Sequence, residues 1–340
     1  MIVYISPINT SFIQRDLIML RSNFRVKHLT LTDNPYFLPF SLIIQTVQLL
    51  FLLPATEKYL CFFSGYHTVI PVIVGKLFNK EVIIQCGGTD AVNLPEINYG
   101  NYRKKWLKMA TIFSFKHCSL IAPVAQSLVK SNYTYDKSLT SSQGLLNLIP
   151  GLKTPIMVIH NGFDSSFWFD NGNEKTPFSF ITVATGISKQ NRALVKGIDL
   201  IIEMAKTFPE YTFTIVGDEK FTSELPNIIT IGVLPQEKIR SLFQEAQFYL
   251  QLSSSEGFPN ALAEAMLCGC IPIGSTVGAI PEIIGDSGFL LSTKDVIDLK
   301  NIFGRLSMAD LVKLRKDAST RIRSRFSYEA RKEKLLKLLA

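Results

Sequence analysis

Short β-rich runs alternate with helical patterns along most of this 340-residue chain, and the alternation starts twice. The first run, MIVYIS (1–6), is followed by an amphipathic helical pattern and then by another β-rich run. Strands that are joined through helices pair in parallel, so the pattern predicts parallel α/β sheets. The runs expected to form strands are 1–6, 25–31, 58–65, 81–88, 119–125 and 156–162, then 178–186, 211–218, 227–232, 248–253 and 270–275.

The alternation is interrupted by an aperiodic loop, SSFWFDNGNEKTP. A chain of this length exceeds one ordinary core, so we expect two doubly wound domains, with ligands bound in the cleft between them, beyond the carboxyl ends of the strands. Neither domain carries G-x-G-x-x-G after its first strand, which argues against a dehydrogenase. The predicted division is an N-terminal domain (1–164), a linker (165–177), a C-terminal domain (178–320) and a basic C-terminal helix (321–340) that returns to the first domain.

The net charge of +8 is distributed unevenly. Residues 1–164 hold 15 Lys and Arg against 8 Asp and Glu, whereas residues 165–340 hold 21 against 20. The first half is therefore expected to attract anions, either nucleic acid or the anionic face of a membrane. No recognisable nucleic-acid-binding module accompanies the charge, so nucleic acid is the weaker candidate.

The five cysteines show neither a paired framework nor the spacing of metal ligands. Cys268-x-Cys270 lacks the two-residue spacing and the nearby histidines of a zinc site. We expect idle thiols in a reducing cytosol and no bound metal. The N-terminal MIVYISPINTSF has no basic start and no cleavage-site pattern, so a strand is expected there rather than a signal peptide.

The stretch YFLPFSLIIQTVQLLFLLP (36–54) is long and apolar enough to be considered a membrane-spanning helix. It contains two prolines, Gln45 and Gln48, and it lies between two expected strands. These features favour a buried or surface-lying helix of the first domain. Monotopic membrane insertion and a true span are the alternatives.

Glu264 is the single charged side chain in the stretch 257–281. Pro259 suits the first turn of a helix and Gly269 suits the position after its end, so a buried helix is expected between them. A buried carboxylate needs hydrogen-bond donors, and the two hydroxyl groups of a ribose would supply them. The alternative is that backbone groups or an arginine satisfy Glu264.

Glu256 stands in the loop before this helix, and Gly257 allows the backbone to approach a ligand closely. The N–H groups of a helix N-terminus bind phosphate readily. The stretch therefore predicts a site for a nucleotide, its diphosphate and a hydroxyl-rich group that Glu256 contacts. A surface loop charge is the alternative for Glu256.

The segment that contains Glu256 and Glu264 resembles the signature of a known family. EGFPNALAEAMLCGCIPIGSTVGAIPEII is similar to the Glu-x7-Glu signature of the retaining family 4 glycosyltransferases. The resemblance implies the GT-B fold, in which two Rossmann-like doubly wound domains face each other across a cleft and the C-terminal one binds the nucleotide-sugar. It is good from about residue 156 onward and weak over 1–155. The other matching segments are VIHNGFD (158–164), VKGIDLIIEMAK (195–206), TIVGDE (214–219), ITIGVLPQEKI (229–239) and FSYEARKEKLL (326–336).

The resemblance implies roles for residues of the second half. Lys196 would hold the diphosphate, and a lysine at a helix start is itself unfavourable unless an anion binds there. Glu264 would bind the ribose, and Glu256 would contact the donor sugar and stabilise its developing positive charge. Gly257, Phe258, Pro259 and Asn260 would surround the sugar and phosphate, and Ile231, Gly232 and Val233 would lie near the base.

The chain departs from the family pattern in two places. The family usually carries an arginine directly after the strand glycine, here Gly186, but an isoleucine stands there. Arg192 or Lys189 is expected to replace it, with Arg192 favoured. The loop SPINTSF lacks the family's paired glycines, and Asn9 and Thr10 would supply the contacts instead.

First-domain candidates lie around the Gly-Gly turn of QCGGTDAVN. The family often places a histidine near this turn, where the present chain has Cys86 or Gly87. Asp90 is the better candidate for a ligand of sugar hydroxyls, and His67 is the other polar group expected to face the cleft. A structural or solvent-exposed role is the alternative for each.

The implied reaction is transfer of a sugar from a nucleotide-diphosphate sugar to an acceptor hydroxyl, with retention of configuration. Lys196, a second cation and helix N–H groups would neutralise the leaving diphosphate without a metal, and the nucleotide-sugar is a co-substrate, so no cofactor is expected. The departing phosphate oxygen would help to deprotonate the acceptor. Domain closure would exclude water.

A surface rich in cations and aromatics is expected to attach the protein to the cytoplasmic face of an anionic membrane, or else to be an ordinary solvated face. Attachment fits a lipid-linked saccharide acceptor in cell-surface polysaccharide biosynthesis. The residues concerned are Arg103, Lys104, Lys105, Lys108 and Lys116 beside Trp106, Phe113 and Phe115, with Arg321, Arg323, Arg325, Arg331, Lys332, Lys334 and Lys337 of the C-terminal tail.

Two other functions stay open at this stage. A non-catalytic nucleotide-sugar-binding subunit would bind its ligand without turnover, and the missing arginine and glycine pair leave room for it. A GT-B nucleotide-sugar epimerase would act with no acceptor present.

Overall fold

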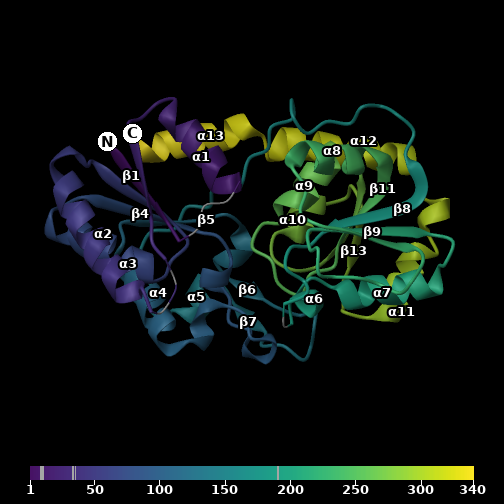
Figure 1. Cartoon of the computed structure of the whole chain (residues 1–340), viewed down its shortest axis with the longest axis horizontal. Coiled ribbons are helices and arrows are strands. Elements are labelled where there is room, and N and C mark those ends of the chain that lie inside the picture. Colours follow the sequence, from purple (N-terminus) through teal and green to yellow (C-terminus); the bar gives the residue numbers. More distant parts are fainter. Residues whose placement is uncertain (8–10, 33, 35, 190) are drawn as a thin grey trace. The chain divides into compact units, whose positions relative to one another are not determined.

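The computed structural model shows two compact units, each built around a parallel sheet (Figure 1). It describes residues 1–7, 11–32, 34, 36–189 and 191–340. The α/β class expected from the alternation is confirmed, because neighbouring strands are parallel in both sheets. Unit 1 comprises Met1–Asn132, Thr140–His160 and Arg331–Ala340, and unit 2 comprises Tyr133–Leu139 and Asn161–Ala330.

Unit 1 has a five-stranded sheet in the order β2-β1-β3-β4-β5. Ile2 and its neighbours in β1 are fully buried because helices cover both faces of a parallel sheet. Two short strands, β6 and β7, form a separate antiparallel pair. The strands are β1 Ile2–Ser6, β2 Val26–Thr30, β3 Lys58–Phe62, β4 Glu81–Cys86, β5 Leu120–Pro123, β6 Ser131–Asn132 and β7 Ser142–Gln143.

The helices of unit 1 divide between the two faces of this sheet. The chain moves in one direction from β1 to β2 and in the other direction from β2 through β3 and β4 to β5. Right-handed crossovers therefore place α1 on one face and α2, α3 and α4 on the other. The helices are α1 Ser11–Arg21, α2 Leu38–Leu52, α3 Tyr66–Leu77, α4 Lys105–His117, α5 Leu145–Leu148 and α13 Tyr328–Leu339.

The last helix, α13, lies beside α1 (Figure 1). There the Arg331 guanidinium donates to both carboxylate oxygens of Asp16, at 2.9 and 2.6 Å, and also to the carbonyl of His160 at 2.9 Å. Arg331 and Asp16 are 5% and 3% exposed. A buried ion pair thus joins the C-terminal segment to the first helix of the chain.

Unit 2 has a six-stranded parallel sheet in the order β10-β9-β8-β11-β12-β13. Phe180 in its centre stacks on Phe213, Phe248 and Phe303, with ring centroids 4.6–5.0 Å apart. The strands are β8 Thr176–Val183, β9 Thr212–Val216, β10 Ile228–Ile231, β11 Ala246–Gln251, β12 Ile271–Ser275 and β13 Phe289–Leu291, and the helices are α6 Arg192–Val195, α7 Ile198–Thr207, α8 Gln236–Glu245, α9 Asn260–Leu267, α10 Ile280–Ile284, α11 Val296–Phe303 and α12 Leu311–Arg325.

One expected strand does not form as such, and three short strands, β6, β7 and β13, were not expected. The run 156–162 makes an isolated bridge from Ile156 to Ile121 and continues beside β5 through two backbone hydrogen bonds, without becoming a named strand. In unit 2, the edge strand β13 pairs with β12 although it has three residues. The run 156–162 and β13 both lie at sheet edges, where pairing on one side leaves strand length weakly determined.

The units depart from the predicted domain boundaries in three places. Tyr133–Leu139 belongs to unit 2, where the carbonyl of Tyr135 accepts the Lys294 N–H at 2.8 Å. The expected linker, 165–177, is also part of unit 2 and contributes Asp170 to an ion pair with Arg315. The tail returns to unit 1 at Arg331 rather than ten residues earlier.

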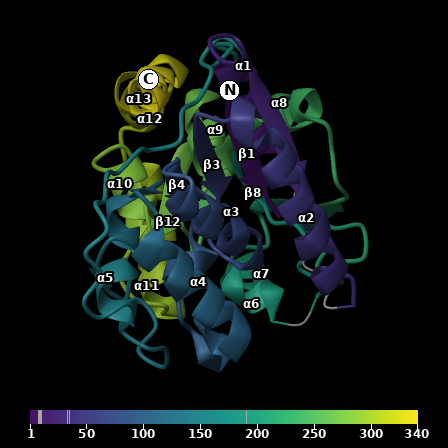
Figure 2. The same ribbon diagram turned by 90° about the vertical axis from the view of Figure 1, so that its left-hand side faces the viewer.

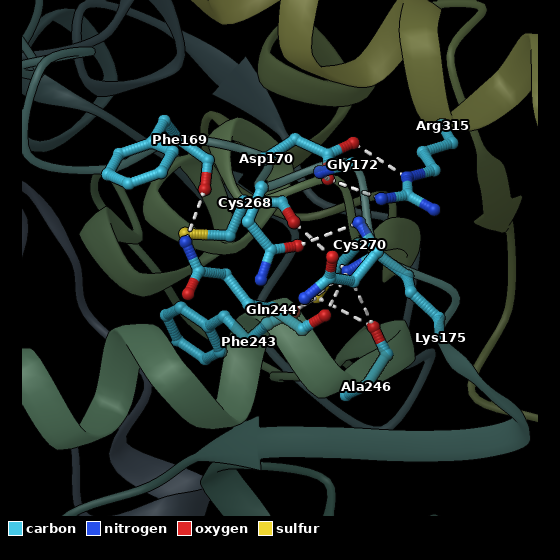
Figure 3. A network of polar contacts seen from close by, with 12 residues as sticks. Phe169, Asp170, Gly172, Lys175, Phe243, Gln244, Ala246, Cys268, Cys270 and Arg315 are labelled. Carbon is cyan, nitrogen blue, oxygen red and sulfur yellow. Dashed lines mark hydrogen bonds and ion pairs between the residues drawn. The ribbon is translucent and has the colours of Figure 1, made fainter.

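Lys175, at the end of the expected linker, is buried and closes two helix ends (Figure 3). Its ammonium donates to the carbonyl oxygens of Phe243, Ala246 and Cys268 at 2.9, 2.9 and 3.0 Å, and to that of Gln244 at 3.4 Å. These carbonyls lie at the C-terminal ends of α8 and α9, where the helix leaves such groups without partners. The lysine therefore fixes α8 and α9 relative to the sheet.

Candidate functional site

Unit 2 has its topological switch point between β8 and β11. The chain enters at β8, moves outward through β9 and β10, and then returns to β11 on the other side. Ligands of open parallel sheets bind beyond the carboxyl ends of the strands at such a point. The loops that follow β8 and β11 carry Lys196 and Glu256, two of the residues predicted from the sequence.

Lys196 and Glu256 form an ion pair at this point, with Nζ 2.5 Å from Oε1. Their side chains are 25% and 13% exposed, so the pair is largely shielded but reachable from solvent. The sequence interpretation assigned an anion to the lysine; in the structure the glutamate carboxylate supplies one. The two candidates that the motifs single out separately thus form one cluster.

The backbone brings these two side chains together. Gly197 has φ +70°, and a Cβ there would lie 2.2 Å from the Leu252 carbonyl oxygen, so the turn between α6 and α7 lies directly against the end of β11. The Ser254 N–H also donates to the Val195 carbonyl at 2.7 Å. Glycine is needed here because no side chain fits.

Side chains of β11 and of the loop that follows it hold the Glu256 carboxylate through hydrogen bonds. Gln251 Nε2 lies 3.1 Å and Ser253 Oγ 2.9 Å from Glu256 Oε1, and both donors are buried. The Lys196 ammonium binds the same oxygen. Oε2 of Glu256 has no partner among the described residues, so it can accept a hydrogen bond from a ligand. The sequence interpretation missed Gln251 and Ser253.

The helix that carries Glu264 starts one residue later than expected. α9 spans Asn260–Leu267, and Pro259 occupies the position just before it. Glu264 is 9% exposed, in agreement with the buried helix inferred from its apolar surroundings. Asn161 Nδ2 donates to Asn260 Oδ1 at 2.9 Å and so links the segment VIHNGFD to the start of α9.

Phe258 packs inward rather than into open space. It is 7% exposed, stacks on Phe163 at 5.9 Å and meets Phe326 edge-to-face at 5.4 Å. The neighbouring Gly257 carbonyl accepts the Ala279 N–H at 3.1 Å. The ring therefore anchors the loop, and the predicted contact of Phe258 with the sugar and phosphate stays a prediction.

A second cation lies beside Gly186, where the family pattern expects an arginine. A Cβ on Gly186 would lie 2.9 Å from a terminal nitrogen of Arg192 and 3.7 Å from Cδ of Lys189, so both side chains pass over this glycine. The Arg192 guanidinium is exposed and has no partner in the described part of the chain. Its position agrees with the prediction that Arg192 replaces the family arginine.

The predicted base-binding residues follow β10. Val233 is 68% exposed, and the side chain of Glu219 lies against Gly232, 2.4 Å from where a Cβ would be. In the loop after β9, Asp218 accepts from the backbone and hydroxyl of Ser188 at 2.8 and 2.7 Å. The loops that follow the neighbouring strands β10, β9, β8 and β11 thus lie side by side.

The candidates of unit 1 are placed differently. Asp90 is fully buried, and its carboxylate accepts from the backbone N–H groups of Ser64, Gly87 and Gly88 at 2.9–3.2 Å and from the Cys86 thiol. Burial raises the pKa of Asp90, while the backbone N–H donors lower it. This arrangement is that of a carboxylate that organises its loop, and it gives no support to a contact with sugar hydroxyls.

His67 is 4% exposed, and its Nε2 lies 3.0 and 3.1 Å from the carbonyl oxygens of Phe62 and Phe63. It therefore holds the turn after β3, which is the structural alternative to a ligand role. Asn9 and Thr10 lie outside the described residues. Their predicted contacts stay predictions.

The thiols are idle, as expected. All five cysteines are free and buried, and burial raises the pKa of each thiol, to about 12 for Cys118 and about 11 for Cys270. Among the described residues, no three His, Cys, Asp or Glu side chains gather into a group that could hold a metal ion.

Comparison with known proteins finds similarity over the part of the chain that carries this site. Residues 182–307 match the family model described as "Glycosyl transferases group 1". The GDP-mannose:cellobiosyl-diphosphopolyprenol alpha-mannosyltransferase of Xanthomonas oryzae is 28% identical over 172 residues, which cover 46% of this chain and 45% of that protein. The N-acetyl-alpha-D-glucosaminyl L-malate synthase of Bacillus anthracis is 32% identical over 198 residues, or 51% of each chain. The chain spans between a quarter and a half of the length of the first curated relatives it matches.

The likeness to solved structures extends over the whole chain. The structure of HepE from Anabaena in complex with UDP superposes with a TM-score of 0.72 and covers 99% of both chains, at 14% identity. At that identity the likeness concerns the fold, and the fold is GT-B, with its two parallel-sheet units. The part of the chain that carries Lys196, Glu256 and Glu264, residues 182–307, is therefore similar to the group 1 glycosyltransferases, and it is set in a chain with the GT-B fold.

Proposed function

We propose that this chain is a retaining glycosyltransferase that moves a sugar from a nucleotide-diphosphate sugar to an acceptor hydroxyl. The observation that carries the proposal is the ion pair of Lys196 and Glu256 at the switch point of unit 2, beside the helix that holds Glu264. A cation, a carboxylate with one unoccupied oxygen and a buried carboxylate are what a diphosphate, a sugar and a ribose require. The family match over 182–307 supports the same reaction class.

Each residue of the proposed donor site has its own role in the reaction. Lys196 and Arg192 neutralise the leaving diphosphate, and the N-terminus of α9 adds its backbone N–H groups, so no metal is needed. Glu256 keeps Oε1 on Gln251 and Ser253 and offers Oε2 to the donor sugar. Lys196 exchanges its carboxylate partner for phosphate oxygens when the donor binds, which leaves Glu256 free to stabilise positive charge at the sugar.

The proposed acceptor is a lipid-linked saccharide used in cell-surface polysaccharide assembly, at the cytoplasmic face of the plasma membrane. Two observations support this choice. The Xanthomonas relative is named for a cellobiosyl-diphosphopolyprenol acceptor. Unit 1 also exposes the cations Arg103, Lys104, Lys105 and Lys108 beside Trp106, which suits an anionic membrane surface.

The donor site is tested by calorimetric titration of UDP, GDP and ADP, and then of their sugars. We expect one nucleotide series to bind and Glu264→Gln to weaken it at least about tenfold, because the ribose hydroxyls lose a charged acceptor. Glu245→Gln, an exposed glutamate on α8, is the matched control and should bind as the wild type does. Equal binding by Glu264→Gln and the wild type, or binding of none of the nucleotides, contradicts the proposed donor site.

Turnover separates the proposal from its two alternatives. With the identified donor and a polyprenyl-diphosphate saccharide, the wild type should release the nucleoside diphosphate, and Lys196→Met should not. Donor binding without turnover on any offered acceptor would favour a non-catalytic nucleotide-sugar-binding subunit. Conversion of the nucleotide-sugar with no acceptor present would favour an epimerase.

A further inference from the structure

Helix α2 buries the side chains of Gln45 and Leu49 and exposes most of its other apolar side chains. Gln45 is 3% exposed and donates to the His67 carbonyl at 2.9 Å, whereas Phe40 and Phe51 are 67% and 84% exposed. A surface helix of a soluble domain normally shows the opposite pattern. The window Leu38–Ala55 has a mean hydropathy of 1.8, and only 11% of it is buried.

The exposed apolar side chains of α2 lie along one face of the helix. Their spacing of three and four residues is that of a single helical stripe. No charged residue interrupts α2. The α2 stripe consists of Phe40, Ile43, Ile44, Val47 and Phe51, each more than half exposed.

The helices next to α2 extend this apolar surface. α2 packs on α3 and α3 packs on α4, on the sheet face opposite α1 (Figure 2). Leu77 and Phe78 at the end of α3 are 73% and 47% exposed, and Trp106 and Met109 on α4 are 67% and 52% exposed. An apolar surface of this extent on one layer marks an interaction site.

The charges on this layer have one sign. α2, α3 and α4 contain no Asp or Glu. The exposed cations of the layer and of the segment that leads into α4 are Lys76, Arg103, Lys104, Lys105, Lys108 and Lys116. Exposed apolar groups flanked by lysines match the acyl chains and anionic headgroups of a bilayer, and they do not match a second copy of the same basic surface.

The part of the basic C-terminal tail that belongs to unit 1 does not join this surface. α13 packs on α1, which lies on the opposite face of the sheet, and Arg331 is buried against Asp16. Phe115 is also buried, so it adds nothing to the exposed face of α4. Within unit 1 the expected basic and aromatic surface therefore lies around α4, and α2 supplies the apolar part that the sequence interpretation did not assign.

We propose that α2 is an in-plane membrane anchor: the α2 stripe enters the acyl boundary of an anionic bilayer, and the cations around α4 contact its headgroups. The inference deepens the membrane location given under the proposed function and rests on it, and its test requires neither a donor nor turnover. An interfacial helix of this kind sinks about 5–10 Å below the headgroups.

The fold argues against α2 as a membrane span. By length and composition alone, α2 with the 3-10 turn that continues it, Leu38–Ala55, could cross a membrane, but the sheet argues against it. The strands before and after it, β2 and β3, both pair with β1. A span would place these two strands on opposite sides of the membrane and would break the sheet.

Vesicle flotation of the full chain tests the proposal. We expect binding to vesicles of phosphatidylcholine mixed with phosphatidylglycerol, and much weaker binding to phosphatidylcholine alone. Ile43→Gln with Val47→Gln should reduce binding at least about tenfold. Lys104→Gln with Lys105→Gln should reduce binding to the anionic vesicles by about fivefold for each lysine, and should change binding to the neutral vesicles little.

The matched control replaces the same residue types in unit 2. Ile297 and Val312 are 68% and 83% exposed, against 63% and 62% for Ile43 and Val47, so Ile297→Gln with Val312→Gln removes at least as much exposed apolar surface elsewhere. This control should bind vesicles as the wild type does. Equal losses in both pairs, or no vesicle binding by the wild type, would overturn the anchor. So would a wild-type dimer in light scattering that the α2 pair dissociates, because α2 would then be an interface between copies.

Tryptophan fluorescence gives an independent measurement on the same samples. The chain has two tryptophans, of which Trp106 is 67% and Trp168 is 3% exposed. Vesicle binding should shift the emission to shorter wavelength, and Trp106→Phe should remove the shift while binding persists. Binding without a shift in the wild type would contradict the placement of α4 at the headgroups. Nucleotide binding by the α2 variants should be normal, so failure of the anchor and failure of the donor site give different results.

Discussion

Gly197 occupies a position where both the backbone angle and the available space exclude a side chain. Its φ is +70°, and an added Cβ would lie 2.2 Å from the Leu252 carbonyl oxygen. Gly172 has a similar φ of +77° but no atom within 4 Å of its Cβ position. Alanine substitutions at these two glycines therefore allow the cost of backbone strain to be measured apart from the cost of steric exclusion.

We predict that Gly172→Ala lowers the free energy of unfolding by about 1 kcal/mol, the cost of the left-handed conformation alone. Gly197→Ala should cost at least about 2 kcal/mol more, because the β11 end must also move. Urea unfolding of both variants measures the difference. Since Lys196 precedes Gly197, the Gly197 variant should also lose nucleotide affinity, and an equal cost at both positions would contradict the close approach.

For individual residues, the sequence predicts which side chains belong to the site better than it predicts the contacts that those side chains make. Glu256, Glu264 and Lys196 are found from motifs and from the lack of other charge around them, and the structure places Lys196 and Glu256 together. Their ion pair could not be predicted, because it depends on the tertiary approach of two loops 60 residues apart. Gln251 had a signal, since it is a polar residue inside an apolar strand run, but its partner was not evident. For Asp90 the sequence favours a ligand of sugar hydroxyls, whereas in the structure its carboxylate accepts hydrogen bonds from the backbone N–H groups of Ser64 and Gly88.

Among the elements, α8 and α9 share one terminal contact, the Lys175 ammonium (Figure 3). We predict that Lys175→Met lowers the free energy of unfolding by about 3 kcal/mol or more, because several buried carbonyls lose a charged donor at once. The urea midpoint measures this loss. Lys300→Met, at a lysine for which no buried contact is described, is the comparison and should leave the midpoint unchanged. A small effect of Lys175→Met would mean that water replaces the ammonium.

The strands of both sheet centres could be predicted because strands buried on both faces read as continuous apolar runs. Edges and connections could not be predicted in the same way. The run 156–162 is apolar enough for a strand but meets β5 in one bridge. Tyr133–Leu139 carries no periodicity that assigns it to unit 2, because its partners, such as Lys294, are far away in the sequence. The composition of α2 predicts a helix. Which face of the helix is exposed could not be predicted, because it depends on the packing of α3 against Gln45.

For the whole molecule, the buried ion pair of Asp16 and Arg331 joins the C-terminal segment to the rest of unit 1. Removing one member of a buried pair leaves an uncompensated charge, at a cost of about 3–5 kcal/mol, whereas replacing both with apolar residues costs less. We therefore predict that Arg331→Met destabilises the chain strongly and that adding Asp16→Leu recovers much of the loss.

Chemical unfolding of the two single variants and the double variant measures this coupling. The exposed pair of Lys206 and Glu203 supplies the control, because its side chains are 54% and 45% exposed and Lys206→Met should leave the unfolding transition in place. Additive losses in the Asp16 and Arg331 cycle would show that the two charges are not coupled.

The same contact has a consequence for the order in which the chain is made. Asp16 is synthesised 315 residues before its partner. At about 5–20 residues per second, the buried carboxylate waits roughly 15–60 s for Arg331, and unit 2 emerges from the ribosome in the meantime. The N-terminal unit therefore cannot close first, although it starts first. A chain released after position 330 would contain all of unit 2 but an open unit 1, and the open one is the unit that carries α2.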